Sequence, residues 1–233
     1  MTSRCVRVQQ IVIDTPWSAV VRLDLGASAF AFRAGQAATL GRSAATTKPY
    51  SIASSPDSAR RDRAVEFLIG VKSDGTLGSH LASLTVGSMV WLGQPFGTFG
   101  LPKRLTVRRL LLIAGGTGVA PLRSVLHSAL GARTPPAITL LYSAQSADGF
   151  AFVREFRQLS RAGRMRLRLT VTREAGPRWR GRRGRIQTSW LGQELRAGPT
   201  LCLVCGPPGF VEDVCGKLKS LGVPPSRIKR EAH

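Results

Sequence analysis

One short segment of this chain combines a cation, an aromatic ring and a hydroxyl. Lys48, Pro49, Tyr50 and Ser51 follow one another directly. Side chains of these types can neutralise a phosphate, stack on a planar ring and hydrogen-bond to it. The alternative interpretation is an ordinary strand with its tyrosine in a core.

Three further segments are turns that could expose backbone amides or end a buried strand. Residues 75–79 (Gly-Thr-Leu-Gly-Ser) could wrap a diphosphate, although a simple turn has the same composition. Residues 115–118 (Gly-Gly-Thr-Gly) lie between an apolar run and a helical pattern, where a helix N-terminus can hold an anion, although a turn that only needs glycine backbone angles has the same composition. Cys205, Gly206 and Pro207 end another apolar run, at the place where parallel strands put ligands, although a buried cysteine usually has a structural role.

The sequence pattern changes about halfway along the chain, and the elements of the two halves must position these segments. In the first hundred residues, short strand-like runs alternate with Gly, Pro and Ser, which predicts an antiparallel barrel. In the second half, apolar runs alternate with helical patterns, which predicts a parallel α/β domain. The strands of the barrel are expected at residues 6–13, 20–25, 36–40, 50–53, 65–71 and 89–92. The α/β domain is expected to contain strands at 109–114, 138–142, 166–172 and 200–205 and helices at 120–130, 150–160 and 209–221.

In this order, the four segments resemble the ferredoxin–NADP reductase superfamily. Its members join a flavin-binding barrel, with an Arg-x-Tyr-Ser motif and a pyrophosphate loop, to a nucleotide domain with Gly-Thr-Gly-x-Ala-Pro and Cys-Gly-Pro-Pro turns. This sequence has the corresponding segments at residues 48–51, 75–79, 116–121 and 205–208, so the resemblance covers essentially the whole chain. It departs from the pattern at Lys48, where the family has Arg, and at Gly78, where the family has Ser or Thr.

The resemblance implies FAD and NADPH as cofactors, with NADH as the alternative coenzyme. Residues 1–103 would form the FAD-binding β-barrel domain and residues 104–233 the NAD(P)-binding α/β domain. Tyr50 would lie against the flavin ring, and Ser51 would hydrogen-bond near the reactive N5 atom. The residues implied at the reacting centre are Ser51, Cys205 and Glu231, with Cys205 acting by shape and packing and not as a nucleophile. The residues expected to bind the cofactors are Lys48, Pro49, Tyr50, Ser51, Val71, Gly75, Thr76, Leu77, Gly78, Ser79, Gly116, Thr117, Gly118, Thr172, Arg173, Arg185, Cys205, Gly206, Pro207 and His233.

Coenzyme choice depends on two basic positions. Arg173, which follows Thr172, and Arg185 are similar to the family's positions that hold the 2′-phosphate of NADP, and a guanidinium pair would form charge-assisted bonds with it. Gln145 stands where many NADP-specific members have another Arg. The C-terminal residue His233 could cover the flavin, in the place of the family's terminal aromatic ring, or belong to a frayed end.

The charge of the chain has two interpretations, an acidic or phosphorylated partner or an arginine-rich composition on a solvated surface. It contains 34 basic and 13 acidic residues, a formal net charge of +21, and twelve arginines fall between residues 154 and 185. Such a field attracts polyanions and acidic proteins. The resemblance implies hydride transfer from NADPH to FAD and then one-electron transfer to ferredoxin or flavodoxin, both typically acidic. The alternatives are an NADH-linked reductase component of an oxygenase, a reductase of free flavins, and a basic nucleic-acid-binding domain, which has few aromatic residues to support it.

Several classes of protein are not expected. No apolar run is long enough to span a membrane, and the N-terminus has no signal region, so we predict a cytoplasmic protein. The four cysteines fit neither a disulfide framework nor a zinc or iron–sulfur spacing, and we expect no metal. His127 lies on a predicted helix, where we expect a packing or surface role.

Overall fold

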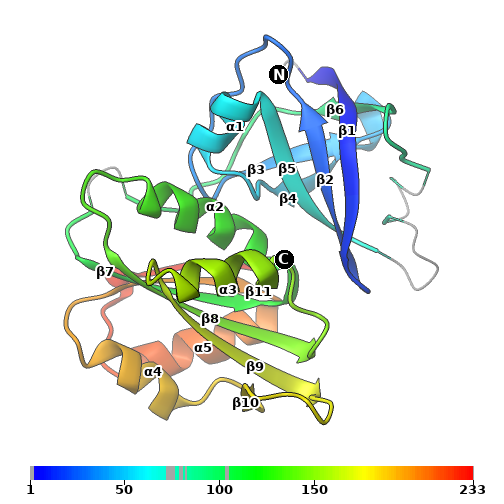
Figure 1. Cartoon of the computed structure of the whole chain (residues 1–233). Coiled ribbons are helices and arrows are strands. Elements are labelled where there is room, and N and C mark those ends of the chain that lie inside the picture. The colour runs from blue at the N-terminus through cyan, green and yellow to red at the C-terminus, as the bar shows by residue number, and fades with distance from the viewer. Residues whose placement is uncertain (1–2, 72–76, 79–80, 82, 103–104, 233) are drawn as a thin grey trace.

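The chain forms two six-stranded sheets, one antiparallel and one parallel (Figure 1). The computed structural model describes residues 3–71, 77–78, 81, 83–102 and 105–232. The antiparallel sheet comes from the first half of the chain, and the parallel sheet, with helices on both faces, from the second. The fold class predicted from the sequence is therefore confirmed. The predicted boundary between residues 103 and 104 stays a prediction, because both residues lie outside the described part.

The antiparallel sheet closes into a barrel. Its strand order is β4-β3-β6-β1-β2-β5, and a bridge between Ile52 and Phe67 joins the two edges beyond β4 and β5. Alternate residues such as Val8, Val21 and Leu40 fill its core because successive side chains of a strand point to opposite faces. The elements are β1 (Arg4–Thr15), β2 (Ser18–Asp24), β3 (Ala37–Gly41), β4 (Lys48–Ser51), α1 (Pro56–Asp62), β5 (Ala64–Gly70) and β6 (Met89–Leu92).

The parallel sheet has the strand order β10-β9-β8-β7-β11-β12. The chain therefore moves outward from β7 on one side and later returns to the other side with β11, which makes the space above β7 and β11 a topological switch point. The elements are β7 (Arg109–Gly115), α2 (Val119–Leu130), β8 (Ala137–Ser146), α3 (Val153–Arg161), β9 (Arg166–Glu174), β10 (Arg182–Arg183), α4 (Thr188–Leu195), β11 (Leu201–Gly206), α5 (Pro208–Ser220) and β12 (Ile228–Ala232).

The helices cover the two faces of this sheet in pairs (Figure 1). One core lies beneath α2 and α3 and contains Leu112, Leu140 and Phe156. The opposite core lies beneath α4 and α5 and contains Ile113 and Val204. Both faces of β7 and β11 are thus buried, which explains their continuous apolar runs.

One of the buried apolar clusters extends across the junction of the barrel and the α/β domain. Ala53, Leu68 and Phe99 of the N-terminal half belong to the same buried cluster as Val119 and Ala120 of α2. No helix in the described ranges is long and apolar enough to cross a membrane. The predicted cytoplasmic location stays a prediction.

The structure differs from the expected bounds at β4, which begins and ends two residues earlier, at β8, which ends four residues later, and at the start of α3. The helix expected from residue 150 begins at Val153, because Phe152 has a φ of 57°. A left-handed residue cannot continue a right-handed helix. The Phe152 N–H donates instead to Asp14 Oδ2 of the barrel, at 2.6 Å. Four short elements, α1, α4, β10 and β12, were not expected from the sequence.

Candidate functional site

A cavity of about 340 Å³ lies where the barrel meets the α/β domain. Tyr50 and Ser51 line it from β4, Thr117 from the turn after β7, and Glu231 from β12. Phe96 completes the barrel side. The structure therefore brings together residues from both halves of the chain that were singled out in the sequence.

Strand pairing sets the place of Tyr50. β4 pairs with β3 so that Tyr50 lies opposite Ala38, and the ring is half-buried. Burial raises the pKa of the Tyr50 phenol, so the hydroxyl stays protonated at neutral pH. The Gly78 N–H donates to Gly70 O at 3.0 Å, and a Cβ added at Gly78 would lie 3.9 Å from Tyr50 Oη.

The remaining predicted barrel residues lie around this cavity or outside the described ranges. Pro49 lines it, whereas Lys48 is exposed and does not. Val71 and Leu77 bridge each other beside β5. Gly75, Thr76, Ser79 and His233 lie outside the described residues, so their predicted roles stay predictions.

Cys205 and Glu231 are neighbours at the ends of β11 and β12, where they are paired in register. Cys205 is fully buried, and burial, together with the nearby Glu231, raises the pKa of its thiol. A protonated, inaccessible thiol is consistent with the expected packing role. Burial also raises the pKa of Glu231, whose Oε2 is buried and has no hydrogen-bond partner among the described residues.

A second cavity, of about 480 Å³, lies at the carboxyl ends of the parallel strands. Thr172, Arg173, Arg185, Gly116 and Pro207 all line it, so residues from four segments of the sequence converge here. Arg173 and Arg185 are exposed, and their guanidinium groups form no hydrogen bond or ion pair in the described part of the chain. Two unpaired guanidinium groups beside a glycine turn and a helix N-terminus make this cavity suited to a phosphorylated ligand.

The turns after β7 and β11 come very close to each other. A Cβ at Gly118 would lie 2.4 Å from Cys205 O and 2.6 Å from Gly206 N, so only glycine fits. Gly116 adopts a φ of 55°, which glycine also favours. Gly118, Cys205 and Gly206 are buried and line neither cavity; they pack the two turns together.

A third cavity, of about 350 Å³, links the first two. It shares Thr117 with the first and Gly116 and Gln145 with the second. Trp17, from the turn between β1 and β2, lines it and is 58% exposed. No pattern in the sequence indicates Trp17, because most of the residues that line this cavity with it are distant from it in the chain.

His127 has a polar partner that the sequence did not indicate. It lies on α2, half-buried, and its Nε2 bonds to Glu155 on α3. This contact joins α2 to α3 and adds a polar partner to the expected packing or surface role. Metal-ligand clusters are absent from the described ranges.

Comparisons with known proteins support the same family. A model described as an oxidoreductase NAD-binding domain matches residues 112–216. The chain is 28% identical to the naphthalene 1,2-dioxygenase system ferredoxin–NAD(P)(+) reductase component of Pseudomonas putida, over 99% of this chain and 69% of the relative. It is 30% identical to a reductase component of the naphthalene 1,2-dioxygenase/salicylate 5-hydroxylase systems from Ralstonia sp., with the same two coverages.

The fold is similar to that of a solved ferredoxin–NADP+ reductase. The structure of this enzyme from Neisseria gonorrhoeae, with bound FAD and NADP, superposes with a TM-score of 0.82. The match covers 100% of this chain and 99% of that one at 21% identity.

Proposed function

This chain belongs to the ferredoxin–NADP reductase superfamily of FAD- and NAD(P)H-dependent oxidoreductases, and we propose that it carries electrons from NADPH through FAD to a one-electron protein carrier. Ferredoxin or flavodoxin is the carrier we propose. The single observation that supports this most strongly is the continuity of the three cavities. They run from Tyr50 in the barrel, past Thr117, to Arg173 and Arg185 at the end of the parallel sheet.

The residues of the first cavity fit an aromatic ring system with polar edges. Tyr50 offers a half-buried ring, Ser51 offers a hydroxyl, and Glu231 offers its buried Oε2, which has no partner among the described residues. A buried polar atom without a partner is costly, so a ligand that donates to it would stabilise the site. When bound, FAD would supply the conversion between two-electron chemistry and one-electron transfer.

The side chains of this cavity would bind and orient, and none needs to form a covalent bond. Tyr50 would stack on the ring, and Ser51 would hold it by a hydrogen bond. Cys205 keeps its proton and packs against the turn at Gly118. Glu231 can accept a hydrogen bond at Oε2 or, because burial raises its pKa, bind a proton there.

The second cavity would hold NADPH. The N-terminal end of α2 faces it through the turn at Gly116, which suits a pyrophosphate. Arg173 and Arg185 would hold the 2′-phosphate that NADH lacks, and Thr172 would lie beside them. Asp213 also lines the cavity, but its carboxylate is paired with Lys217 Nζ at 2.6 Å. The local charge therefore remains favourable to a phosphate.

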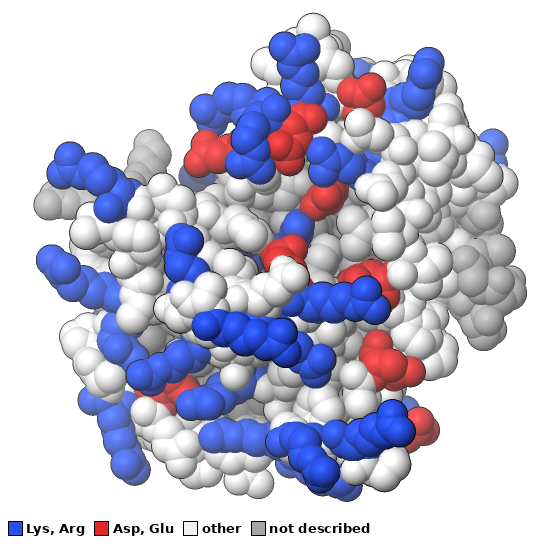
Figure 2. All heavy atoms as spheres, viewed as in Figure 1, with Lys and Arg blue, Asp and Glu red and all other residues white. Residues whose placement is uncertain are grey.

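The surface charge supports an acidic carrier. Lys and Arg side chains crowd the α/β domain in Figure 2, where few acidic groups lie between them. Of the formal charge of +21, residues 107–233 contribute the larger part, with 22 basic and 7 acidic residues. A field of this kind steers an acidic protein toward the chain and speeds its association.

A second candidate is an NADH-linked reductase component of an oxygenase system. Gln145 lines the coenzyme cavity where an additional arginine would strengthen the selection of NADPH. The two relatives described above are reductase components of dioxygenase systems and are named with NAD(P)(+). This candidate changes the coenzyme and the final acceptor, but not the chemistry of the first cavity.

Steady-state reduction of protein carriers would separate these candidates. We expect NADPH to support reduction of a ferredoxin or flavodoxin with a higher kcat/KM than NADH. The rate at subsaturating carrier should fall steeply between low salt and physiological ionic strength, where the Debye length is about 8 Å. Reduction of a small artificial acceptor at saturating coenzyme should change much less. Equal use of both coenzymes would favour the oxygenase-type reductase, and carrier reduction without salt dependence would reject steering by the basic surface.

A further inference from the structure

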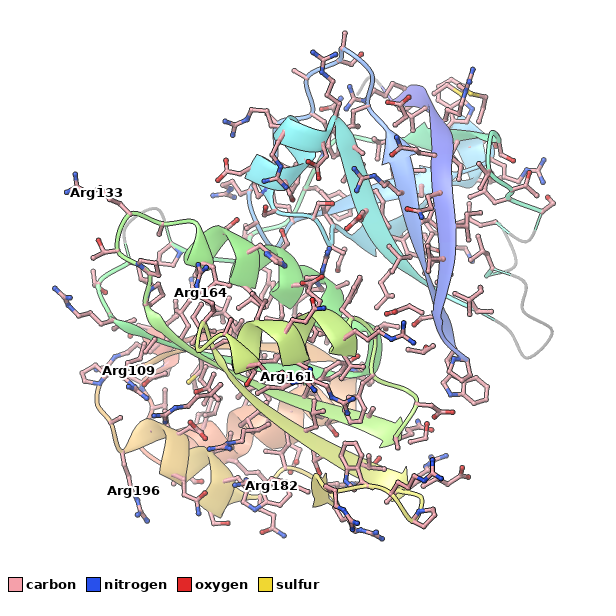
Figure 3. The ribbon with its side chains drawn as sticks, viewed as in Figure 1. Arg109, Arg133, Arg161, Arg164, Arg182 and Arg196 are labelled. Carbon is pink, nitrogen blue, oxygen red and sulfur yellow. The ribbon has the colours of Figure 1, made fainter. Side chains whose placement is uncertain are left out.

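A separate cavity of about 410 Å³ lies at the opposite edge of the parallel sheet, where the strands begin. Its lining includes Arg109, Arg164, Arg166 and Arg168, together with Thr139. The coenzyme cavity lies at the carboxyl ends of the same strands, so the two cavities are separated by the length of the sheet. Figure 3 shows Arg109 and Arg164 at the edge where the strands start.

Strand alternation places three of these arginines on one face. Leu110 of β7 and Leu167 of β9 face the core beneath α2 and α3. Arg109 and Arg166, each one residue away, therefore point to the other face. The same reasoning applies to Arg168, whose Nε contacts Glu194 of α4.

Three adjacent strands bring these groups together. Arg109 lies opposite Ala137 of β8, and Thr139 of β8 lies opposite Arg166 of β9. β7 and β9 are thus two strand spacings apart, about 10 Å. Guanidinium groups spread over this distance suit an elongated anion with several charged groups better than a single carboxylate.

The positive charge of this cavity is poorly compensated. The guanidinium groups of Arg109 and Arg166 have no hydrogen bond or ion pair within the described part of the chain, and Arg109 Nε is buried. Arg164 donates to Leu130 O at the end of α2, at 3.3 Å, and this carbonyl partly compensates the charge of its guanidinium group. Arg168 shares Glu194 with Thr139, at 3.4 and 3.1 Å. Among the described residues, Arg168 is therefore the one of these four arginines that has a carboxylate partner.

We propose that this cavity is a second anion site and that it binds an oligophosphate chain. Guanidinium groups form paired, charge-assisted hydrogen bonds with phosphate oxygens. A chain of linked phosphates supplies several negative charges in a row and would offset the repulsion between Arg109, Arg166 and Arg168. The site is independent of the coenzyme cavity and of the proposed electron-transfer function.

Calorimetric titration with inorganic tripolyphosphate tests this proposal. All proteins carry Arg173→Ala and Arg185→Ala, so that the coenzyme cavity contributes little. We expect this background to bind tripolyphosphate, and Arg109→Ala with Arg166→Ala to weaken binding about ten-fold or more. Arg133→Ala with Arg196→Ala removes the same charge from exposed positions outside the cavity and should change affinity by no more than about two-fold. A matched titration with ATP distinguishes a nucleotide from a free phosphate chain.

Three results would overturn the proposal. The first is that neither tripolyphosphate nor ATP binds to the Arg173→Ala, Arg185→Ala background. The second is an equal loss of affinity in the cavity variant and the surface variant, which would indicate diffuse attraction. The third result applies if the Arg109→Ala, Arg166→Ala variant does not fold. Arg166 is exposed, and Arg166→Ala alone should weaken binding several-fold, so an unchanged affinity of this single variant would reject the site.

Discussion

Arg123 of α2 donates from Nη1 to Glu66 Oε2 of β5 at 2.8 Å, across the junction between the barrel and the α/β domain. The same guanidinium bonds to Ala53 O at 3.1 Å and to Glu155 Oε2 on α3 at 2.9 Å. It also stacks over the Phe152 ring, 4.5 Å from the ring centroid. One side chain thus fixes the barrel against both helices that cover the first face of the parallel sheet.

We expect Arg123→Ala to lower the free energy of unfolding by about 2–4 kcal/mol, because it leaves Glu66 and Glu155 partly buried without this partner. The side chains of Arg123 and Glu66 are only 15% and 19% exposed. Chemical denaturation would measure the change. The control is Arg60→Ala, whose ion pair with Asp57 is largely exposed and should contribute about 1 kcal/mol or less. Equal effects of the two substitutions would contradict a structural role of the Arg123 network.

Glu155 should make the stability depend on pH. Burial would raise its pKa, but the hydrogen bond from His127 and the charge of Arg123 outweigh burial and hold the pKa below its ordinary value. A group with a lowered folded-state pKa stabilises the fold above its unfolded pKa and loses this contribution as the pH falls through the folded value. Between about pH 6 and pH 3, the wild type should therefore lose more stability than Glu155→Gln. Glu212→Gln, at an exposed position of α5, should keep the wild-type slope, and a wild-type slope in Glu155→Gln would reject the prediction.

Gly118→Ala should disturb the junction of the two turns. The added methyl would meet the backbone of Cys205 and Gly206, which cannot rotate away, and overpacking of this kind costs about 1–3 kcal/mol. We expect a lower unfolding midpoint and a raised KM for the coenzyme. Gly216→Ala in α5 meets no atom within 4 Å and should be neutral or stabilising. A Gly118→Ala protein as stable and active as the wild type would show that the turns tolerate separation.

Arg173→Ala and Arg185→Ala test the choice of coenzyme. Each should raise the KM for NADPH about ten-fold and leave the KM for NADH nearly unchanged, because a charged hydrogen bond contributes roughly 1.5–3 kcal/mol. Arg180→Ala, an exposed arginine that does not line the cavity, is the matched control. A parallel rise in the KM of both coenzymes would mean that these arginines do not distinguish the 2′-phosphate.

The fold could be predicted from the sequence where apolar periodicity is strong. β7 and β11 are buried on both faces, and their continuous apolar runs indicate them directly. β12 could not be predicted, because Ile228–Ala232 is an edge strand with mostly polar, partly exposed residues. α4 depends on packing of Leu191 against the core beneath α5, and a short helix containing a glycine has little intrinsic tendency to form.

The separate motifs of the candidate site could be predicted from the sequence, but the contacts between them could not. The turns at 115–118 and 205–207 can be identified by their glycines and prolines, which have specific backbone preferences. The pairing of Glu231 with Cys205 depends on β12, which the sequence does not indicate. The contact of Arg123 with Glu66 joins residues 57 positions apart, and a charged residue in a sequence does not indicate its partner.

The visible absorption spectrum of the purified protein, recorded before and after anaerobic addition of NADPH, tests the proposed function most directly. We expect the absorption of one bound FAD per chain, bleached by NADPH, and severe loss of flavin or slowed bleaching after Tyr50→Ala with Ser51→Ala. Phe30→Ala, on the barrel but outside the first cavity, should keep the flavin. A colourless protein that takes up no FAD on incubation, or a bound flavin that NADPH does not bleach, would contradict the proposed function.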